Sequence, residues 1–212
     1  MMARSTRVEL DLLEKRIGGC RHCVEGGLLA EANPVRRGRG TDRARLMIVG
    51  QAPGATGHLH PKPFSGAAGR TLRGWLVSAG FPEDALHDGE RVFLTSVTKC
   101  FPGPSIAGKG DRLPSPAEVR LCRPYLDEEI RLVQPVVVLA LGRLAATELL
   151  GPQPLSVLVG PEHTAERAGQ EFSVVALSHP SGVSRWLNDP ANRAKHHEAL
   201  EKLSVLRVRH GL

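Results

Sequence analysis

Four short apolar runs, separated by segments with helical periodicity, constrain the fold of this chain more than any other feature. Strands that are buried on both faces show such continuous runs, and they occur in parallel sheets that helices cover on both sides. The runs are residues 45–50, 91–100, 136–142 and 172–182. The pattern predicts an α/β fold with a central four-stranded parallel sheet and helices on both faces.

Helical patterns lie before, between and after these runs. The clearest one starts at Ser115, where Glu118 completes a capping box ahead of an apolar stripe and proline occupies the first helical position. A final helix is predicted to start at Asp189, a helix-capping residue that is again followed by proline. The other predicted helices are residues 8–17, 68–79 and 143–150.

The length of 212 residues and a hydrophobic content of 41% suit a single domain. Residues 1–44 are expected to form a helix, a cysteine pair and a basic connector, and residues 45–212 the α/β core. No run approaches the roughly 18 apolar residues that a membrane span needs, and the N-terminus lacks the apolar core of a secretory signal. We expect a cytoplasmic monomer that is not bound to a membrane.

The charge of the chain favours a polyanionic partner. Lysine and arginine number 28 against 22 acidic residues, which gives a net charge of +6 and a pI near 9.5. If the partner is DNA, we expect basic residues near the predicted ligand loops to neutralise phosphates. The candidates are Lys62, Lys99, Lys109, Arg112 and Arg185.

Four loops follow the predicted strands, and in open parallel sheets ligands bind outside the carboxyl ends of the strands. The loops are residues 50–66, 96–114, the segment from 142 onward, and 178–186. The first is broken by glycine and proline, holds two histidines and contains no carboxylate. A small-molecule enzyme of Rossmann type is the weakest interpretation, because the first strand is not followed by the G-x-G-x-x-G pattern.

The cysteines form an uneven set. Cys20 and Cys23 make a C-x-x-C pair, Cys100 ends the second run, and Cys122 lies in the capped helix. One tight pair plus two dispersed cysteines suits a four-thiolate iron–sulfur cluster better than a zinc ribbon, while tetrahedral zinc stays open. The alternative is that Cys100 and Cys122 are buried residues that only pack.

Four motifs, in this order along the chain, resemble those of the uracil-DNA glycosylase superfamily, in its iron–sulfur families 4 and 5. They are the leading C-x-x-C, "GQAPG…KPFSGAAGRTL", "TSVTKCFPG…PSPAEVRLCRPYL" and "HPSG". The resemblance implies the covered parallel sheet, removal of uracil from DNA, and a 4Fe-4S cluster. The ligands that it implies are Cys20, Cys23, Cys100 and Cys122.

The same resemblance makes Phe64 the ring on which a flipped base stacks and His179 the histidine of the last motif. A base must leave the duplex before its glycosidic bond can be reached, and stacking on an aromatic ring recovers about 1–3 kcal/mol. A neutral, donating His179 would stabilise the negative charge that develops on the departing base. Gly50 and Ser181 suit close approach to the substrate.

Two positions depart from the family pattern. Gln51 stands where the iron–sulfur enzymes commonly have a glutamate, so Gln51 and His58 are the predicted residues that position the attacking water. Ser96 stands where many members have an asparagine that reads the uracil edge. Asp111, the acidic residue of the second loop, replaces the missing carboxylate only if that loop closes over the site.

The leading hypothesis is a monofunctional DNA glycosylase that removes a deaminated base, uracil first, from single- or double-stranded DNA. The alternative is an iron–sulfur module that binds nucleic acid without glycosylase activity, and the missing carboxylate motivates it. Release of the base from a damaged oligonucleotide separates the two.

Overall fold

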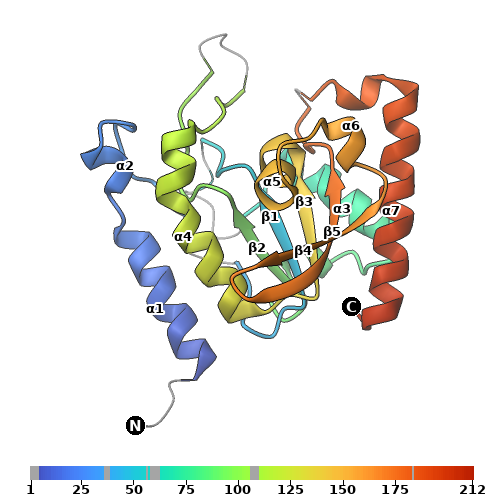
Figure 1. Cartoon of the computed structure of the whole chain (residues 1–212), viewed down its shortest axis with the longest axis horizontal. Coiled ribbons are helices and arrows are strands. Elements are labelled where there is room, and N and C mark those ends of the chain that lie inside the picture. Colours follow the sequence, from blue (N-terminus) through green and yellow to red (C-terminus); the bar gives the residue numbers. More distant parts are fainter. Residues whose placement is uncertain (1–4, 36–38, 56, 58–62, 106–109, 183) are drawn as a thin grey trace.

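A five-stranded sheet runs through the middle of the molecule, in the order β2–β1–β3–β5–β4 (Figure 1). The computed structural model describes residues 5–35, 39–55, 57, 63–105, 110–182 and 184–212. The strands are β1 (Leu46–Gly50), β2 (Val92–Ser96), β3 (Val137–Leu141), β4 (Glu162–Arg167) and β5 (Gln170–Leu177). Strands β2, β1, β3 and β5 are parallel, which confirms the four predicted strands and their direction.

The fifth strand corrects the prediction of a four-stranded sheet. Strand β4 pairs with β5 in the antiparallel direction through a turn at Ala168 and Gly169, both of which have positive φ. It lies at the edge of the sheet, and none of its residues is fully buried. An edge strand of this kind has no continuous apolar run, so the criterion that found the other four strands passed over it.

Helices cover both faces of the sheet, as predicted (Figure 1). Helix α4 lies on one face beside α5, with α1 outside it, and α3 and α7 pack together on the other face. The longer helices are α1 (Thr6–Gly19), α3 (Ala67–Ser78), α4 (Pro116–Val133), α5 (Gly142–Leu150) and α7 (Pro190–His210). The short ones are α2 (His22–Glu25), α6 (Leu155–Leu158) and the 3-10 turns η2 (Ala85–His87) and η3 (Trp186–Asn188).

The predicted helix starts are confirmed in detail. Ser115 accepts a hydrogen bond from the Glu118 N–H (3.2 Å), and the Glu118 carboxylate accepts one from the Ser115 N–H (2.5 Å), so both halves of the capping box are present. Asp189 caps α7 through its side chain, which accepts a hydrogen bond from the Ala191 N–H (2.8 Å). Helix α1 buries three apolar residues of the predicted segment 8–17 in the same core as the sheet.

The parallel strands all end at one edge of the sheet, and the loops that leave this edge are the ones predicted to bind a ligand. Within the described ranges, no helix combines the length and the apolar composition that a lipid bilayer requires.

One buried histidine lies between α3 and α7. The His196 ring is 7% exposed and meets the Trp75 ring edge to face, with 4.4 Å between the ring centroids. Neither ring nitrogen of His196 has a hydrogen-bond partner among the described residues. Burial, reinforced by the charge of His197, lowers the pKa of His196 to about 4.

We predict that the free energy of unfolding falls as the pH drops from about 6.5, the usual pKa of histidine, toward about 4. The sign follows because His196 is neutral in the fold, whereas the unfolded chain binds a proton below its ordinary pKa. Replacing His196 by phenylalanine keeps the ring contact and should flatten this dependence in denaturant titrations. An unchanged slope in His196→Phe would contradict the prediction, and exposed His197→Gln is the matched control, expected to change the slope much less.

Candidate active site

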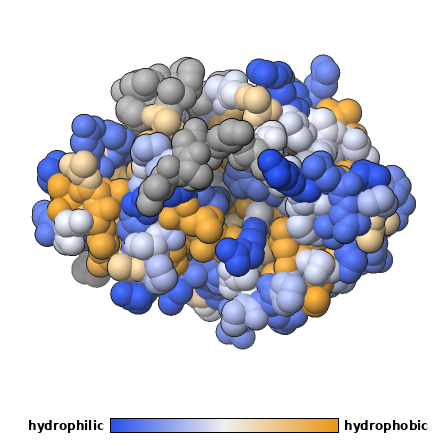
Figure 2. All heavy atoms as spheres, turned by 90° about the horizontal axis from the view of Figure 1, so that it is seen from above, coloured by the Kyte–Doolittle hydropathy of each residue, from blue (hydrophilic) through white to orange (hydrophobic). Residues whose placement is uncertain are grey.

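A cavity of about 740 Å³ opens at the carboxyl edge of the sheet. Figure 2 looks onto this edge and shows a hollow with apolar surface beside it. Residues from separate loops line the cavity, and seven of them were predicted from the sequence to act on the substrate. They are Gly50, Gln51, Phe64, Ser96, Asp111, His179 and Ser181.

His179 follows the end of β5 and is held in one tautomer. Its Nδ1 accepts hydrogen bonds from the Ser181 backbone N–H (3.2 Å) and from the Ser181 hydroxyl (2.8 Å). A backbone N–H can only donate, so the proton of the neutral imidazole is on Nε2. Burial lowers the pKa of His179, and the charge of Asp111 partly opposes this, so the ring is a neutral donor at pH 7. Ser181, predicted to contact the substrate, here orients the histidine.

Gly142, at the start of α5, leaves the space that His179 occupies. Its φ is +82°, and a Cβ at this position would lie 3.2 Å from the His179 Cβ. A side chain at residue 142 would therefore press on the imidazole as well as strain the backbone.

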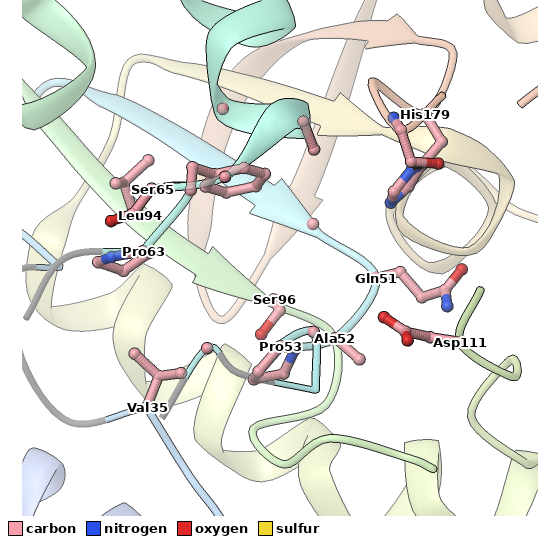
Figure 3. A pocket seen from close by; sticks show the side chains of 18 of the residues that line it. Val35, Gln51, Ala52, Pro53, Pro63, Ser65, Leu94, Ser96, Asp111 and His179 are labelled. Atoms are coloured by element: carbon pink, nitrogen blue, oxygen red, sulfur yellow. Dashed lines mark hydrogen bonds between the residues drawn. The ribbon is translucent and has the colours of Figure 1, made fainter. Parts of the chain in front are cut away.

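Asp111 reaches the cavity from the second loop. Figure 3 shows Gln51, Asp111 and His179 on one side of the cavity, opposite Pro63, Ser65 and Leu94. The Asp111 carboxylate also approaches the first loop, because a Cβ on Gly54 would lie 3.4 Å from its Oδ2. The second loop thus brings a carboxylate to the site where the first loop has none.

Asp111 and His179 influence each other electrostatically. Burial raises the pKa of Asp111 above its ordinary value, and the positive charge that His179 carries when protonated would partly offset the rise. A carboxylate with a raised pKa is a stronger base, so Asp111 is suited to accept a proton from a water molecule. Gln51 lies beside it and donates from Nε2 to the Arg112 carbonyl (3.4 Å), which joins the first loop to the second.

Phe64 adopts a left-handed backbone conformation, with φ at +56°, which is unfavourable for a residue with a side chain. Two neighbours hold it there. His87 Nε2 donates to the Pro63 carbonyl (2.9 Å), and Gly69 allows close passage, since a Cβ there would lie 1.6 Å from the Phe64 carbonyl oxygen. The Phe64 ring then lies in van der Waals reach of Gly50, at the end of β1.

Ser96 ends β2 and has a defined hydrogen-bonding polarity. Its hydroxyl is 2.7 Å from the Thr98 carbonyl oxygen, which can only accept, so Ser96 donates its single proton there. Only lone pairs of the Ser96 hydroxyl remain for a ligand in the cavity, and a ligand N–H group is the partner that they can accept.

The residues predicted to contact DNA phosphates differ in their exposure to solvent. Lys99 is 3% exposed, and its ammonium donates to Glu129 Oε2 (2.9 Å) and to the Ser96 carbonyl (2.6 Å). A buried ammonium paired in this way cannot reach a phosphate at the surface. The prediction that Lys99 contacts a DNA phosphate is therefore wrong. Arg185 is exposed at the start of η3 and stays a predicted phosphate contact. His58, Lys62 and Lys109 lie outside the described residues.

Arg112 is paired within the protein. Its guanidinium donates to both carboxylate oxygens of Glu118, at 2.8 and 2.6 Å. Part of its donor capacity is thus used within the protein. The pair could not be predicted from the sequence, because Arg112 lies in a loop whose path is set by tertiary packing.

The four cysteines come from three parts of the chain and are free thiols. Burial, reinforced by the other thiols, raises the pKa of Cys23 to about 12 and that of Cys100 to about 11. Backbone N–H groups of Asn33 and Lys99 hydrogen bond to the Cys100 and Cys122 sulfurs, as they do in sites that hold anionic sulfur. In the described part of the chain, no three His, Cys, Asp or Glu side chains are grouped as ligands of one metal ion.

A neutral histidine donor, a carboxylate and an aromatic ring line one cavity at the carboxyl edge of a parallel sheet, which is where α/β enzymes bind their ligands. The family model of the Uracil DNA glycosylase superfamily matches residues 37–204. The chain belongs to this superfamily, and it is a DNA glycosylase.

Curated relatives include Type-4 and Type-5 uracil-DNA glycosylases. A Type-4 uracil-DNA glycosylase of Archaeoglobus fulgidus is 32% identical over 202 residues, which cover 93% of this chain and 92% of the relative. One from Pyrobaculum aerophilum is 32% identical over 183 residues, or 84% and 86% of the two chains. A Type-5 uracil-DNA glycosylase of Thermus thermophilus is 37% identical over 128 residues, or 56% and 55%. The resemblance to families 4 and 5 is confirmed.

His87, Gly69 and Gly142 shape the site, although no sequence motif marked them.

We predict that His87→Ala weakens binding of a uracil-containing oligonucleotide by up to about tenfold. The reason is that part of the roughly 1–3 kcal/mol contributed by a base stacked on Phe64 is lost. His87→Gln retains a donor at the Nε2 position and should bind like the wild type. Fluorescence anisotropy measures both, and a uracil-free oligonucleotide is the control. Equal binding by all three proteins would contradict the role of His87.

Proposed function

We propose that this glycosylase hydrolyses the N-glycosidic bond of uracil in DNA and releases the base without cutting the backbone. The observation that carries the proposal is the meeting of Asp111 and His179 in one cavity beside Phe64. The names of the Type-4 relatives, which extend over most of the chain, support uracil as the base.

Recognition of uracil uses Phe64 and Ser96. The flipped base stacks on the Phe64 ring, and the Ser96 hydroxyl accepts the N3–H of uracil. Cytosine has a lone pair at N3, which would face the lone pairs of Ser96. The polarity of Ser96 therefore favours uracil over cytosine, the base from which it arises by deamination.

Bond cleavage uses His179 and Asp111. The electron pair of the bond between C1′ and N1 passes to the base, and the His179 Nε2–H donates a hydrogen bond to the oxygen on which the charge develops. Water then adds to the cationic C1′, and Asp111 takes up the proton that this water loses. The base leaves as an anion and is protonated by solvent. Gln51, tied to the second loop, orients the water.

The position of Asp111 removes the reason for the alternative, a binding module without activity. That alternative was motivated by the absence of a carboxylate from the first loop, and the second loop provides one.

We also propose that Cys20, Cys23, Cys100 and Cys122 hold a 4Fe-4S cluster. The mutual electrostatic effects of the four thiols and the N–H groups at Cys100 and Cys122 support this set of ligands. When bound, the cluster would cross-link the N-terminal cysteine pair, the loop after β2 and helix α4.

DNA is the partner, and exposed Arg185 is a proposed phosphate contact.

We predict that His179→Ala slows single-turnover release of uracil by roughly 10²- to 10³-fold, the usual effect of one preorganised donor. Asp111→Asn should slow it by about 10²-fold or more, since the general base is lost. Gln51→Ala should lose less. Wild-type rates of Asp111→Asn would show that the water is handled elsewhere.

The same assay has a predictable pH dependence. Asp111 must be ionised and His179 neutral, and both conditions fail at acid pH. Burial lowers the pKa of His179, so the ring becomes protonated only below the ordinary histidine value of about 6.5. Because the pKa of Asp111 is raised, its acid limb should lie above the value of about 4 for an ordinary aspartate. Asp111→Asn should remove this limb. An acid limb that persists unchanged in Asp111→Asn would contradict the assignment.

A further prediction concerns the metal. Cys100→Ser or Cys122→Ser should abolish the visible absorption of an iron–sulfur cluster and lower the thermal unfolding midpoint, because each removes one ligand of the cross-link. Iron, sulfide and zinc are measured in the purified proteins. Iron content and stability that survive all four single replacements would contradict the cluster, and one zinc per chain would indicate a zinc site.

A further inference from the structure

We propose that Arg112 is a positioning residue, which holds Asp111 in the cavity by fastening the second loop to the start of helix α4. The inference rests on the proposed role of Asp111 in base release. It replaces the phosphate contact that the sequence predicted for Arg112.

The pair of Arg112 and Glu118 is well suited to hold a loop. The two-point contact fixes the direction of the guanidinium as well as its distance. The Glu118 side chain is 3% exposed, against 30% for that of Arg112. Burial would raise the pKa of Glu118, but hydrogen bonds from Arg112 and Ser115 outweigh it and keep the pKa below the ordinary value. The carboxylate is therefore charged. If it separated from Arg112, a buried negative charge would be left without its partner, which is energetically costly.

Backbone contacts on both sides of the loop also restrain the neighbouring residue Asp111. The Arg112 N–H donates to the Gly103 carbonyl (3.0 Å), and Asp111 itself forms an isolated bridge with Pro104. The Arg112 carbonyl accepts from Gln51 (3.4 Å). The two ends of the loop are thus closed at Arg112, and Asp111 cannot move away from His179 without opening these contacts.

Glu118 also links the loop to the cysteines. It lies one helical turn before Cys122, and both side chains are on the buried face of α4. The same helix therefore carries the anchor of the catalytic loop and a proposed ligand of the cluster. A shift of α4 would therefore move Arg112 through Glu118 and displace the neighbouring Asp111.

A positioning role and a phosphate contact make different predictions. A residue that only binds phosphate changes affinity and lowers the slope of log affinity against log salt by about 0.7–0.9. A residue that places the general base lowers the maximal rate on bound DNA, because misplacement by about 1 Å can cost about 100-fold. The guanidinium of Arg112 already has a carboxylate partner, which favours the second role.

The test is single-turnover release of uracil at saturating enzyme, together with DNA binding at several salt concentrations. Arg112→Ala and Arg112→Lys should lower the maximal rate by up to about 100-fold and leave the salt slope unchanged. Lysine keeps the charge but cannot make the two-point contact, so it separates geometry from charge. Arg123→Ala is the matched control, because Arg123 makes a similar two-point contact from α4 to Glu148 (2.6 and 3.0 Å). It should behave like the wild type.

A double variant isolates the path through Asp111. In the Asp111→Asn background, Arg112→Lys should cause no further loss of rate. Further loss there, or a lowered salt slope with an unchanged maximal rate, would overturn the inference. If Asp111→Asn alone has the wild-type rate, it is the proposed function that fails. Thermal unfolding and visible absorption are measured for every variant, and Arg112→Lys decides the matter if Arg112→Ala does not fold.

Discussion

The buried carboxylate of Glu129 is the interaction on which the arrangement of the site depends. It is 0% exposed and accepts hydrogen bonds from Arg39, from the Thr95 hydroxyl (2.6 Å) and from Lys99 (2.9 Å). Helix α4, the end of β2 and the connector before β1 are thereby joined at one point. Removing one member of such a buried network typically costs about 3–5 kcal/mol, because the remaining charges stay buried without a partner.

The residues proposed to act at the site are attached to this network through the end of β2 and through helix α4. Lys99 also binds the Ser96 carbonyl, which places the serine that faces the cavity, and Cys100 follows Lys99 directly. On α4, Cys122 and Glu118 lie about two and about three turns before Glu129, on the buried face. The proposed base-recognition residue, the loop that carries Asp111 and the proposed cluster ligands are therefore attached to one buried network, which suits a reaction that depends on preorganised groups.

The cavity itself combines strain with electrostatic tuning. Phe64 is kept in an unfavourable backbone conformation by His87 and Gly69, and a conformation of this kind persists only where its surroundings impose it. Burial moves the pKa of Asp111 upward and that of His179 downward, so that their values approach each other. A base and a neutral donor can then coexist near pH 7 within one cavity.

The sequence by itself determined the four parallel strands, the starts of α4 and α7 and most residues of the cavity. Continuous apolar runs and capping residues act within a few positions of the chain, and parallel strands necessarily bring their following loops to one edge. Only the tertiary structure decided that Lys99 is buried, that Arg112 binds Glu118 and that Asp111 lies in the same cavity as His179. Their environments are set by residues that come together only when the sheet and helices pack, and burial and charge pairing arise at that stage.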